Sequence, residues 1–283
     1  MSDILTKISE EFDSFTHSQK VVASYVTENT NALAFSTLDD FAMKIGVSTT
    51  TIIRFARALG YSGYSDMQKD IQKIIKDKVS LPERLNSSSA LNMNEDQLLK
   101  DTFNNDINDI HSTFASMSKE DLHQAIETII SAKNVYLLGL RSSFSLSYYM
   151  SSRLGQIRKN VRLIQSVGLD FPEEIIGADE SDICIGFMFP RYSKHTANIL
   201  SWFKQNGVKI ILVTSQNWVS VKDYGDIILP CCVNSVSFKN SFVAPMCLIN
   251  YITAAIAMDD FSGSMEVLKQ TEQILSQGYY LGL

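Results

Sequence analysis

Five short apolar runs in the second half of the chain constrain its fold more than any other feature. They read VYLLGL, VRLI, DICIGF, KIILVT and DIILP, and all of them lie beyond residue 134. Longer segments with helical periodicity, such as SFSLSYYMSSRLGQI and SKHTANILSWFKQNG, separate most of them. Strands that are apolar throughout are buried on both faces, and strands that alternate with helices form a parallel sheet. We therefore expect an α/β domain with three αβα layers, doubly wound in style.

The first 80 residues follow a different pattern. Their apolar residues recur at helical spacing in five short segments, which predicts a small all-α bundle. The segment LPERLNSSSALNMNEDQ then carries a proline and a cluster of serines and asparagines, which is typical of a linker or a helix break. The sequence thus predicts a helical domain over 1–79, a linker with a connecting helix over 80–118, and the α/β domain over 119–283.

The net charge and the positions of the cysteines limit the kinds of binding site that the chain can have. The formal net charge is −6, so nucleic-acid binding needs a local basic surface. The four cysteines lie in or beside apolar runs and form no C-x-x-C pair, so we expect buried, reduced thiols and no metal site. Neither a signal peptide nor a membrane-spanning run of about 18 apolar residues is predicted. We expect a cytoplasmic protein without a cofactor and without a membrane partner.

The stretch GVSTTTIIRFARALG, residues 46–60, holds three consecutive threonines at the start of a helical pattern. Thr37 is expected to cap a helix over 38–45, Gly46 to end that helix, and Ser48 to cap the next one. Two short helices joined by a tight turn that contains glycine form a helix-turn-helix.

The helical projection of this stretch separates two faces. Thr50, Arg54 and Arg57 lie on one face, and apolar side chains lie on the opposite face, toward the bundle. In such motifs the first turn of the second helix meets base edges in the major groove, where hydroxyls and arginine donate hydrogen bonds. No acidic residue occurs between Asp40 and Asp66 to repel DNA. The alternative is an ordinary capped helix with solvated arginines.

The stretch STLDDFAMKIGVSTTTIIRFARALGYSGYSDMQKDI resembles the N-terminal domain of RpiR-type bacterial transcriptional regulators, over about residues 1–78. The resemblance implies that the serine and threonines of the second helix, together with Arg54, read DNA. Tyr61 and Tyr64 match the aromatic-glycine turn of that family, and we interpret them as packing residues. The predicted DNA-contacting residues are Lys44, Ser48, Thr49, Thr50, Thr51, Arg54 and Arg57.

Two loops that follow strands are predicted to line a ligand pocket, because ligands of open parallel sheets bind beyond the carboxyl ends of strands. They read GLRSSFS, from Gly139, and FPRYSKHT, from Phe189. Residues 120–260 resemble the SIS domain, a sugar-phosphate-binding fold related to sugar isomerases, which RpiR-type regulators carry. The first loop of that family reads G-x-G-x-S, and here Arg141 replaces the second glycine. The second reads S-x-S-G-x-T, and here only Ser193 keeps a hydroxyl.

The two arginines of these loops are expected to bind a phosphate or a carboxylate through their forks of N–H donors, in place of the missing serines and glycine. We infer an anionic ligand, such as a phosphosugar or a sugar acid. In the alternative, Arg191 and Tyr192 only pack or contact a partner subunit. Weaker candidates lie in NSVSFKNSF, including Ser235 and Asn240. The predicted ligand-binding residues are Gly139, Arg141, Ser142, Ser143, Arg191, Tyr192, Ser193, Ser237 and Ser241.

Catalysis is not predicted. Sugar-phosphate isomerisation needs a base near the substrate carbons, and the candidates are Glu173, Glu174 and His195. Two adjacent glutamates at a helix start more often favour the helix dipole. The sequence therefore predicts a transcriptional regulator that binds double-stranded operator DNA, controls sugar or related metabolite genes, and forms a homodimer or homotetramer. The alternative is a sugar-phosphate isomerase, or a phosphosugar-binding protein that does not bind DNA.

Overall fold

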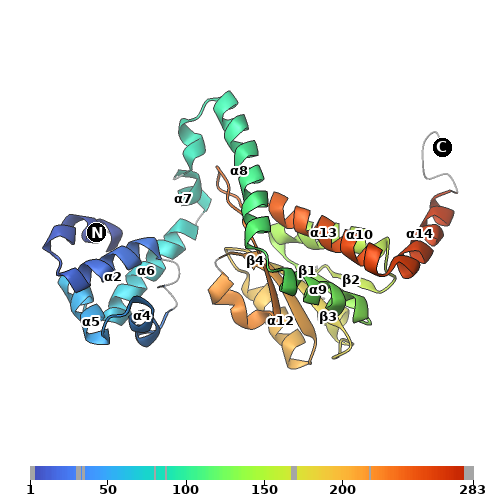
Figure 1. The fold of residues 1–283 in the computed structure, drawn as a ribbon, viewed down its shortest axis with the longest axis horizontal. Helices are drawn as coiled ribbons and strands as arrows, with labels where there is room; N and C mark the ends of the chain where they lie inside the picture. Colours follow the sequence, from blue (N-terminus) through green and yellow to red (C-terminus); the bar gives the residue numbers. More distant parts are fainter. Residues whose placement is uncertain are drawn as a thin grey trace. The chain divides into compact units, whose positions relative to one another are not determined.

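The chain divides into two compact units, Met1–Leu91 and Asn92–Leu283, in the computed structural model (Figure 1). Each unit has a hydrophobic core of its own. The structure describes residues 4–29, 33, 36–79, 81–86, 88–166, 171–216 and 218–276.

The first unit is helical, as the periodicity predicts. Its core holds the fully buried rings of Phe41 and Phe55, and the ring of Phe15 packs edge-on against Phe55 at a centroid distance of 5.2 Å. Pro82 lies in the first turn of a short helix inside the predicted linker, where proline is tolerated because that N–H has no intrahelical acceptor. The elements are α1 (Ile4–Glu11), η1 (Phe12–Ser14), α2 (His17–Glu28), α4 (Leu38–Ile45), α5 (Thr49–Ala58), α6 (Tyr64–Val79), α7 (Leu81–Asn86) and η2 (Ser89–Asn92).

The second unit is built on a sheet of five strands in the order β2-β1-β3-β4-β5, with every neighbouring pair parallel. All residues of β1 and β3 are buried, which explains why these strands are apolar throughout. The strands are β1 (Val135–Gly139), β2 (Val161–Ile164), β3 (Ile183–Met188), β4 (Lys209–Ser215) and β5 (Ile227–Cys231).

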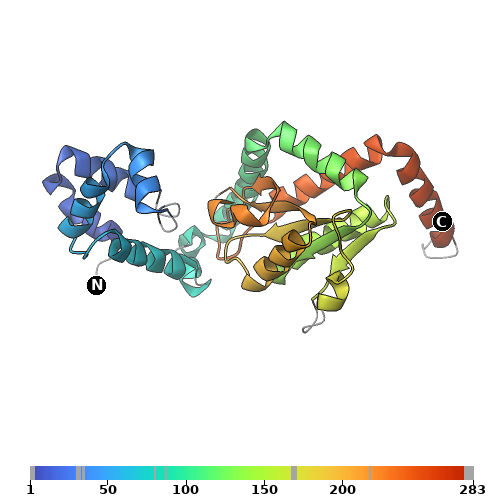
Figure 2. The same ribbon diagram turned by 90° about the horizontal axis from the view of Figure 1, so that it is seen from below.

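Helices cover both faces of this sheet (Figure 2). One core joins α9, α10 and α13 to side chains such as Leu137 and Ile185, and the other joins α12 to side chains such as Leu138 and Leu212. The three-layer α/β fold predicted from the sequence is thereby confirmed. The helical elements are α8 (Glu95–Ser116), α9 (Lys119–Ser131), η3 (Arg141–Ser143), α10 (Phe144–Gly155), α11 (Phe171–Ile175), α12 (Lys194–Gln205), η4 (Trp218–Tyr224), α13 (Val243–Asp259) and α14 (Phe261–Leu275).

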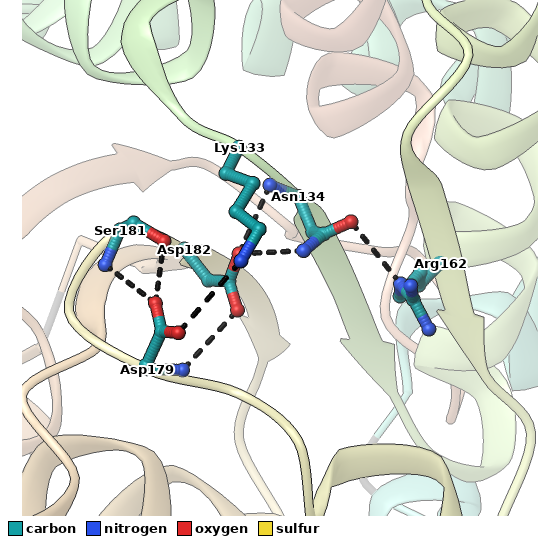
Figure 3. Close-up of polar contacts among 6 residues, drawn as sticks. All are labelled: Lys133, Asn134, Arg162, Asp179, Ser181 and Asp182. Atoms are coloured by element: carbon teal, nitrogen blue, oxygen red, sulfur yellow. Dashed lines mark hydrogen bonds and ion pairs between the residues drawn. The ribbon is translucent and has the colours of Figure 1, made fainter.

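A polar network holds the amino ends of β1 and β3 together (Figure 3). The buried Asp182 carboxylate accepts hydrogen bonds from the backbone N and the Nδ2 of Asn134, at 3.0 and 2.7 Å, and from the backbone N of Asp179 at 3.2 Å. Lys133 Nζ lies 3.9 Å from Asp179 Oδ2. Both carboxylate oxygens of Asp182 accept hydrogen bonds from neighbouring residues, so we interpret this cluster as structural: it joins the starts of β1 and β3.

The cysteines correct one expectation. Cys184, Cys231 and Cys232 are buried, as predicted, but Cys247 is exposed. It lies on the face of α13 that also exposes Val243 and Tyr251. Among the described helices, none is long and apolar enough to cross a bilayer.

Candidate functional sites

The helix-turn-helix is α4, a turn and α5, and its caps lie where the sequence predicts them. The Thr37 side chain accepts a hydrogen bond from the backbone N of Asp40 at the start of α4. Gly46 ends α4 in the left-handed conformation, with φ +68°, which favours glycine. Ser48 then caps α5 by accepting from the backbone N of Thr51 at 3.2 Å.

The two faces of α5 differ as expected. Ile52, Phe55 and Ala56 are fully buried, whereas Thr50, Arg54 and Arg57 are exposed. Lys44, in the last turn of α4, is exposed as well. The exposed face of α5, together with Lys44, therefore provides three cations and the Thr50 hydroxyl, a donor set suited to phosphate oxygens and guanine edges.

Two of the predicted DNA-contacting residues are engaged in the cap of α5. Ser48 Oγ lies 2.9 Å from Thr51 Oγ1, in addition to its bond with the Thr51 backbone. Thr49 and Thr51 are partly buried, and only Thr50 of the three threonines is exposed. Thr51 therefore takes part in the cap of α5, and Thr50 is the one threonine of the three whose side chain is exposed.

The aromatic-glycine turn packs, as the sequence interpretation has it. Tyr61 and Tyr64 are both buried. The Tyr64 hydroxyl donates to the Ser36 carbonyl at 2.8 Å, and the Tyr61 hydroxyl donates to Asp70 at 2.6 Å. Burial, with a smaller contribution from Asp40, raises the pKa of Tyr64 to about 12. These tyrosines fix α6 against the helix-turn-helix.

The carboxyl edge of the sheet in the second unit carries a cluster of unusual backbone conformations. Among the described residues, three non-glycine residues have a left-handed φ: Arg141 at 56°, Ser166 at 50° and Arg191 at 70°. They follow β1, β2 and β3, which are neighbours in the sheet. Such residues cost about 1–3 kcal/mol each and gather at ligand sites. The carboxyl ends of the neighbouring strands β2, β1 and β3 are therefore the candidate ligand site.

The loop after β1 keeps a glycine at its first position and an arginine at its third. A Cβ added at Gly139 would collide with the backbone carbonyl of Ser143, so only glycine fits there. Arg141 adopts the left-handed conformation, and its side chain is exposed. Ser142 is exposed and Ser143 is buried. This loop thus presents a guanidinium group beside the N-terminus of α10.

The loop after β3 is anchored by the two residues that follow Arg191. The Tyr192 hydroxyl lies 3.1 Å from Ser215 Oγ, at the end of β4. Ser193 caps α12 by accepting from the backbone N of Thr196, so its hydroxyl is already engaged. Arg191, which directly precedes both anchors, is partly buried. The loop therefore holds a second guanidinium group next to the first turn of α12.

The segment after β2 is a part of this edge that the sequence interpretation missed. Ser166 Oγ lies 2.9 Å from Nε2 of His195, in the first turn of α12. The Phe171 ring meets the His195 ring edge-on, with centroids 4.8 Å apart. Glu174 accepts hydrogen bonds from the backbone N of Gln165 at 3.0 Å and of Ser166 at 3.2 Å. Ligands of open parallel sheets bind beyond the carboxyl ends of strands, and this rule, which predicts the loops after β1 and β3, applies equally to the segment after β2.

The weaker candidates after β5 reach the same edge only in part. The ring of Phe242 lies 5.2 Å from the ring of Phe189, centroid to centroid, which brings the end of this segment against the loop after β3. Ser241 precedes Phe242 and accepts from the backbone N of Val243, at 3.5 Å. The side chain of Ser235 accepts from the backbone N of Ser237 within its own turn.

Two family models match the chain. The model described as "Helix-turn-helix domain, rpiR family" matches residues 2–78, and the model of the SIS domain matches residues 128–255. An uncharacterized HTH-type transcriptional regulator of Caldanaerobacter subterraneus subsp. tengcongensis is 23% identical, over 98% of this chain and 98% of its own length.

Two solved structures share the fold. The NanR protein of Vibrio vulnificus, complexed with ManNAc-6P, has a TM-score of 0.62 and 16% identity and covers 97% of this chain and 98% of its own. The sugar isomerase domain of an RpiR transcription factor from Sphaerobacter thermophilus has a TM-score of 0.60 and 21% identity, over 62% of this chain and 99% of its own.

Proposed function

The chain is an RpiR-type transcriptional regulator with a helix-turn-helix domain and a SIS domain, and on that premise we propose that its first unit binds operator DNA under the control of an anionic metabolite bound by its second. The observation that carries this proposal is the exposure of Thr50, Arg54 and Arg57 on one face of α5, opposite its buried face.

In the DNA-bound state, the first turn of α5 enters the major groove. Thr50 and Arg54 contact base edges, and Arg57 and Lys44 contact backbone phosphates on either side. Ser48 and Thr51 set the position of the helix start through their own hydrogen bonds. In this assignment Ser48 and Thr51 have a positioning role.

The metabolite binds at the carboxyl edge of the sheet, between the loops after β1 and β3. Arg141 and Arg191 bind its phosphate or carboxylate, since guanidinium donors are arranged in a planar fork that matches both groups. The N-terminus of α12 adds a favourable dipole. The phosphosugar ManNAc-6P in the NanR structure makes a phosphosugar the first ligand class to test, and a sugar acid the second.

We assign no catalytic step to this site. The candidate base Glu174 is held by two backbone N–H donors, and Glu173 is exposed on α11. His195 is hydrogen-bonded to Ser166, which positions its ring as part of the pocket wall. The alternative, isomerisation of a phosphosugar, requires turnover that disappears when His195 is replaced.

The regulator acts in the cytoplasm as a homodimer or homotetramer, because two-fold DNA sites are read by paired helix-turn-helix units. The ligand then acts by changing how two DNA-reading units are spaced.

The test compares the affinity of the full chain for DNA from upstream of its own gene with and without phosphosugars and sugar acids. A metabolite that changes this affinity at least tenfold in the full chain, and not in a chain that ends at residue 91, supports the proposal. The same response in the shortened chain would contradict it, because that chain lacks the second unit.

A further inference from the structure

The helix α8, which begins the second unit, has its polar and apolar faces reversed with respect to its own domain. A helix on a domain surface normally buries its apolar stripe and exposes its polar residues. In α8 the polar residues Asp109 and Thr113 are buried, whereas Phe103 is 64% exposed, Ile107 49% and Phe114 81%.

Hydrogen bonds fix the rotation of α8 about its axis. The Thr113 hydroxyl accepts from the backbone N of Cys232 at 2.8 Å, and Asp109 Oδ1 accepts from Asn234 Nδ2 at 2.7 Å. Asn105 Nδ2 donates to the carbonyl of Asn234 at 2.9 Å. These bonds join α8 to the segment after β5. The helix α8 also packs against β5 and α13 (Figure 1). The apolar face is therefore held toward solvent by specific contacts of the polar face.

The outward residues have the spacing of a coiled-coil seam. Phe103, Ile107, Ile110 and Phe114 follow one another at intervals of 4, 3 and 4 residues, which are d, a, d and a positions of a heptad. Phe103, Ile107 and Phe114 are exposed and Ile110 is partly buried. Exposed phenylalanines and isoleucines in one line form an apolar strip of the kind that marks a protein contact.

We propose that the α8 helix of a second copy of this chain covers the seam, parallel to the first. The proposal deepens the proposed homodimer by naming its contact surface. In a parallel pair each seam residue meets its own counterpart, so Ile107 packs on Ile107 of the other copy. Each α8 follows a DNA-binding unit in sequence, and parallel pairing brings the two N-terminal ends of α8 side by side, as a two-fold DNA reader requires.

The charges beside the seam also favour the parallel orientation. Asp106 and His111 occupy a g and an e position, five residues apart. In a parallel coiled coil the g residue of one helix meets the e residue five positions on in the other helix, so this acid and this histidine pair twice across the seam. In the antiparallel orientation g residues meet g residues, and the two Asp106 carboxylates would repel each other.

The size of the seam indicates its share of the interface. With exposed fractions of 64% and 81%, Phe103 and Phe114 have about 300 Å² per copy left to bury, compared with about 800 Å² per partner in a standard stable interface. The seam thus contributes a large part of the contact, and a charge at its centre should weaken the dimer by a measurable factor.

The test measures the mass of the full chain by sedimentation equilibrium over a range of concentrations. Ile107→Glu should raise the dimer dissociation constant at least tenfold, because it places two carboxylates face to face. Ile107→Leu should keep the dimer, and Phe261→Glu, at an equally exposed position of α14, should leave it unchanged. A wild-type chain that stays monomeric, or a dimer that Ile107→Glu does not weaken while the fold is retained, overturns the proposal.

A disulfide test addresses the orientation. In a Cys247→Ser background, Ile107→Cys should form a disulfide between two copies under mild oxidation, since a positions of parallel pairs lie within disulfide reach. Asn108→Cys, one residue further and exposed on another side of α8, should not. Equal cross-linking of both variants, or of neither, contradicts the parallel seam. Neither test uses DNA, so a failure of the seam and a failure of DNA binding are told apart.

Discussion

The Oγ atom of Ser166 lies 2.9 Å from Nε2 of His195, although 29 residues separate them in the chain. The bond joins the segment after β2 to the first turn of α12, and so connects two walls of the candidate ligand site. Ser166 adopts a left-handed φ of 50° to make it. A strained serine bonded to a histidine at the carboxyl edge of a parallel sheet is an arrangement that favours ligand binding over stability.

Ser166→Ala should weaken metabolite binding about fivefold, since one hydrogen bond that orients the pocket wall is worth about 1 kcal/mol. Affinity for operator DNA in the absence of metabolite should not change. Calorimetric titration with a phosphosugar measures the first and fluorescence anisotropy the second. Ser152→Ala, at an exposed serine of α10 outside the loop after β1, is the matched control and should change neither. Unchanged metabolite affinity in Ser166→Ala would remove Ser166 from the site.

Arg191→Gly should stabilise the protein and weaken ligand binding at once. Glycine accepts the φ of 70° without strain, which should raise the free energy of unfolding by about 0.5–1 kcal/mol. The loss of the guanidinium group should lower the affinity for an anionic ligand at least tenfold.

Arg153→Gly, in the last turn of α10, provides the control with the opposite sign, because glycine is a poor helix former and the contact of Arg153 with the Tyr149 ring is lost, at a cost of about 1 kcal/mol. Urea denaturation measures both variants. If Arg191→Gly destabilised the protein as much as Arg153→Gly does, the strain at position 191 would not be real.

Asp109 should make stability depend on pH. Burial is the main cause that raises the pKa of Asp109, and its Oδ2 has no partner in the structure. An acid whose pKa is higher in the folded state than in the unfolded state stabilises the fold below its ordinary pKa, and this contribution is lost as the pH rises through the raised value. Asp109→Asn keeps an acceptor oxygen for Asn234 and removes the charge.

The free energy of unfolding of Asp109→Asn should therefore fall less than that of the wild type as the pH rises from 4 to 7, and be higher at neutral pH by about 1 kcal/mol. Denaturation curves at a series of pH values give the comparison. If the free energy of unfolding changed with pH by the same amount in both proteins, ionisation of Asp109 would not destabilise the fold.

Gly46→Ala should destabilise the DNA-binding unit by about 1 kcal/mol, because Gly46 has a left-handed φ of 68°. Gly63 is the matched control: a Cβ there meets nothing within 4 Å, and its φ is not left-handed. Thermal unfolding of the two alanine variants gives the difference. A Gly63→Ala variant as unstable as Gly46→Ala would remove the conformational explanation.

The sequence predicts those parts of the fold that depend on local signals. The helix Leu38–Ile45 begins and ends where the predicted one does, because capping residues and apolar periodicity act within a few residues. The five strands are found for the same reason, since each is a short apolar run bounded by polar residues.

Tertiary relationships lie beyond these signals. The left-handed conformation of Arg141 follows from its place between a strand and a helix, and no local pattern requires it. The pairing of Ser166 with His195 depends on how β2 and α12 approach each other. The outward face of α8 depends on hydrogen bonds to the segment after β5, more than 100 residues away in sequence.

The most direct test of the account is the binding of the full chain to DNA from upstream of its own gene and to random DNA, at increasing salt, with wild type, Arg54→Ala and Lys69→Ala. We expect tight binding to the upstream DNA alone, weakened by about 1–3 kcal/mol in Arg54→Ala and unchanged in Lys69→Ala, a substitution on the exposed surface of α6. Equally weak binding to both DNAs that salt abolishes, with Arg54→Ala indistinguishable from Lys69→Ala, would mean that α5 does not read DNA sequence.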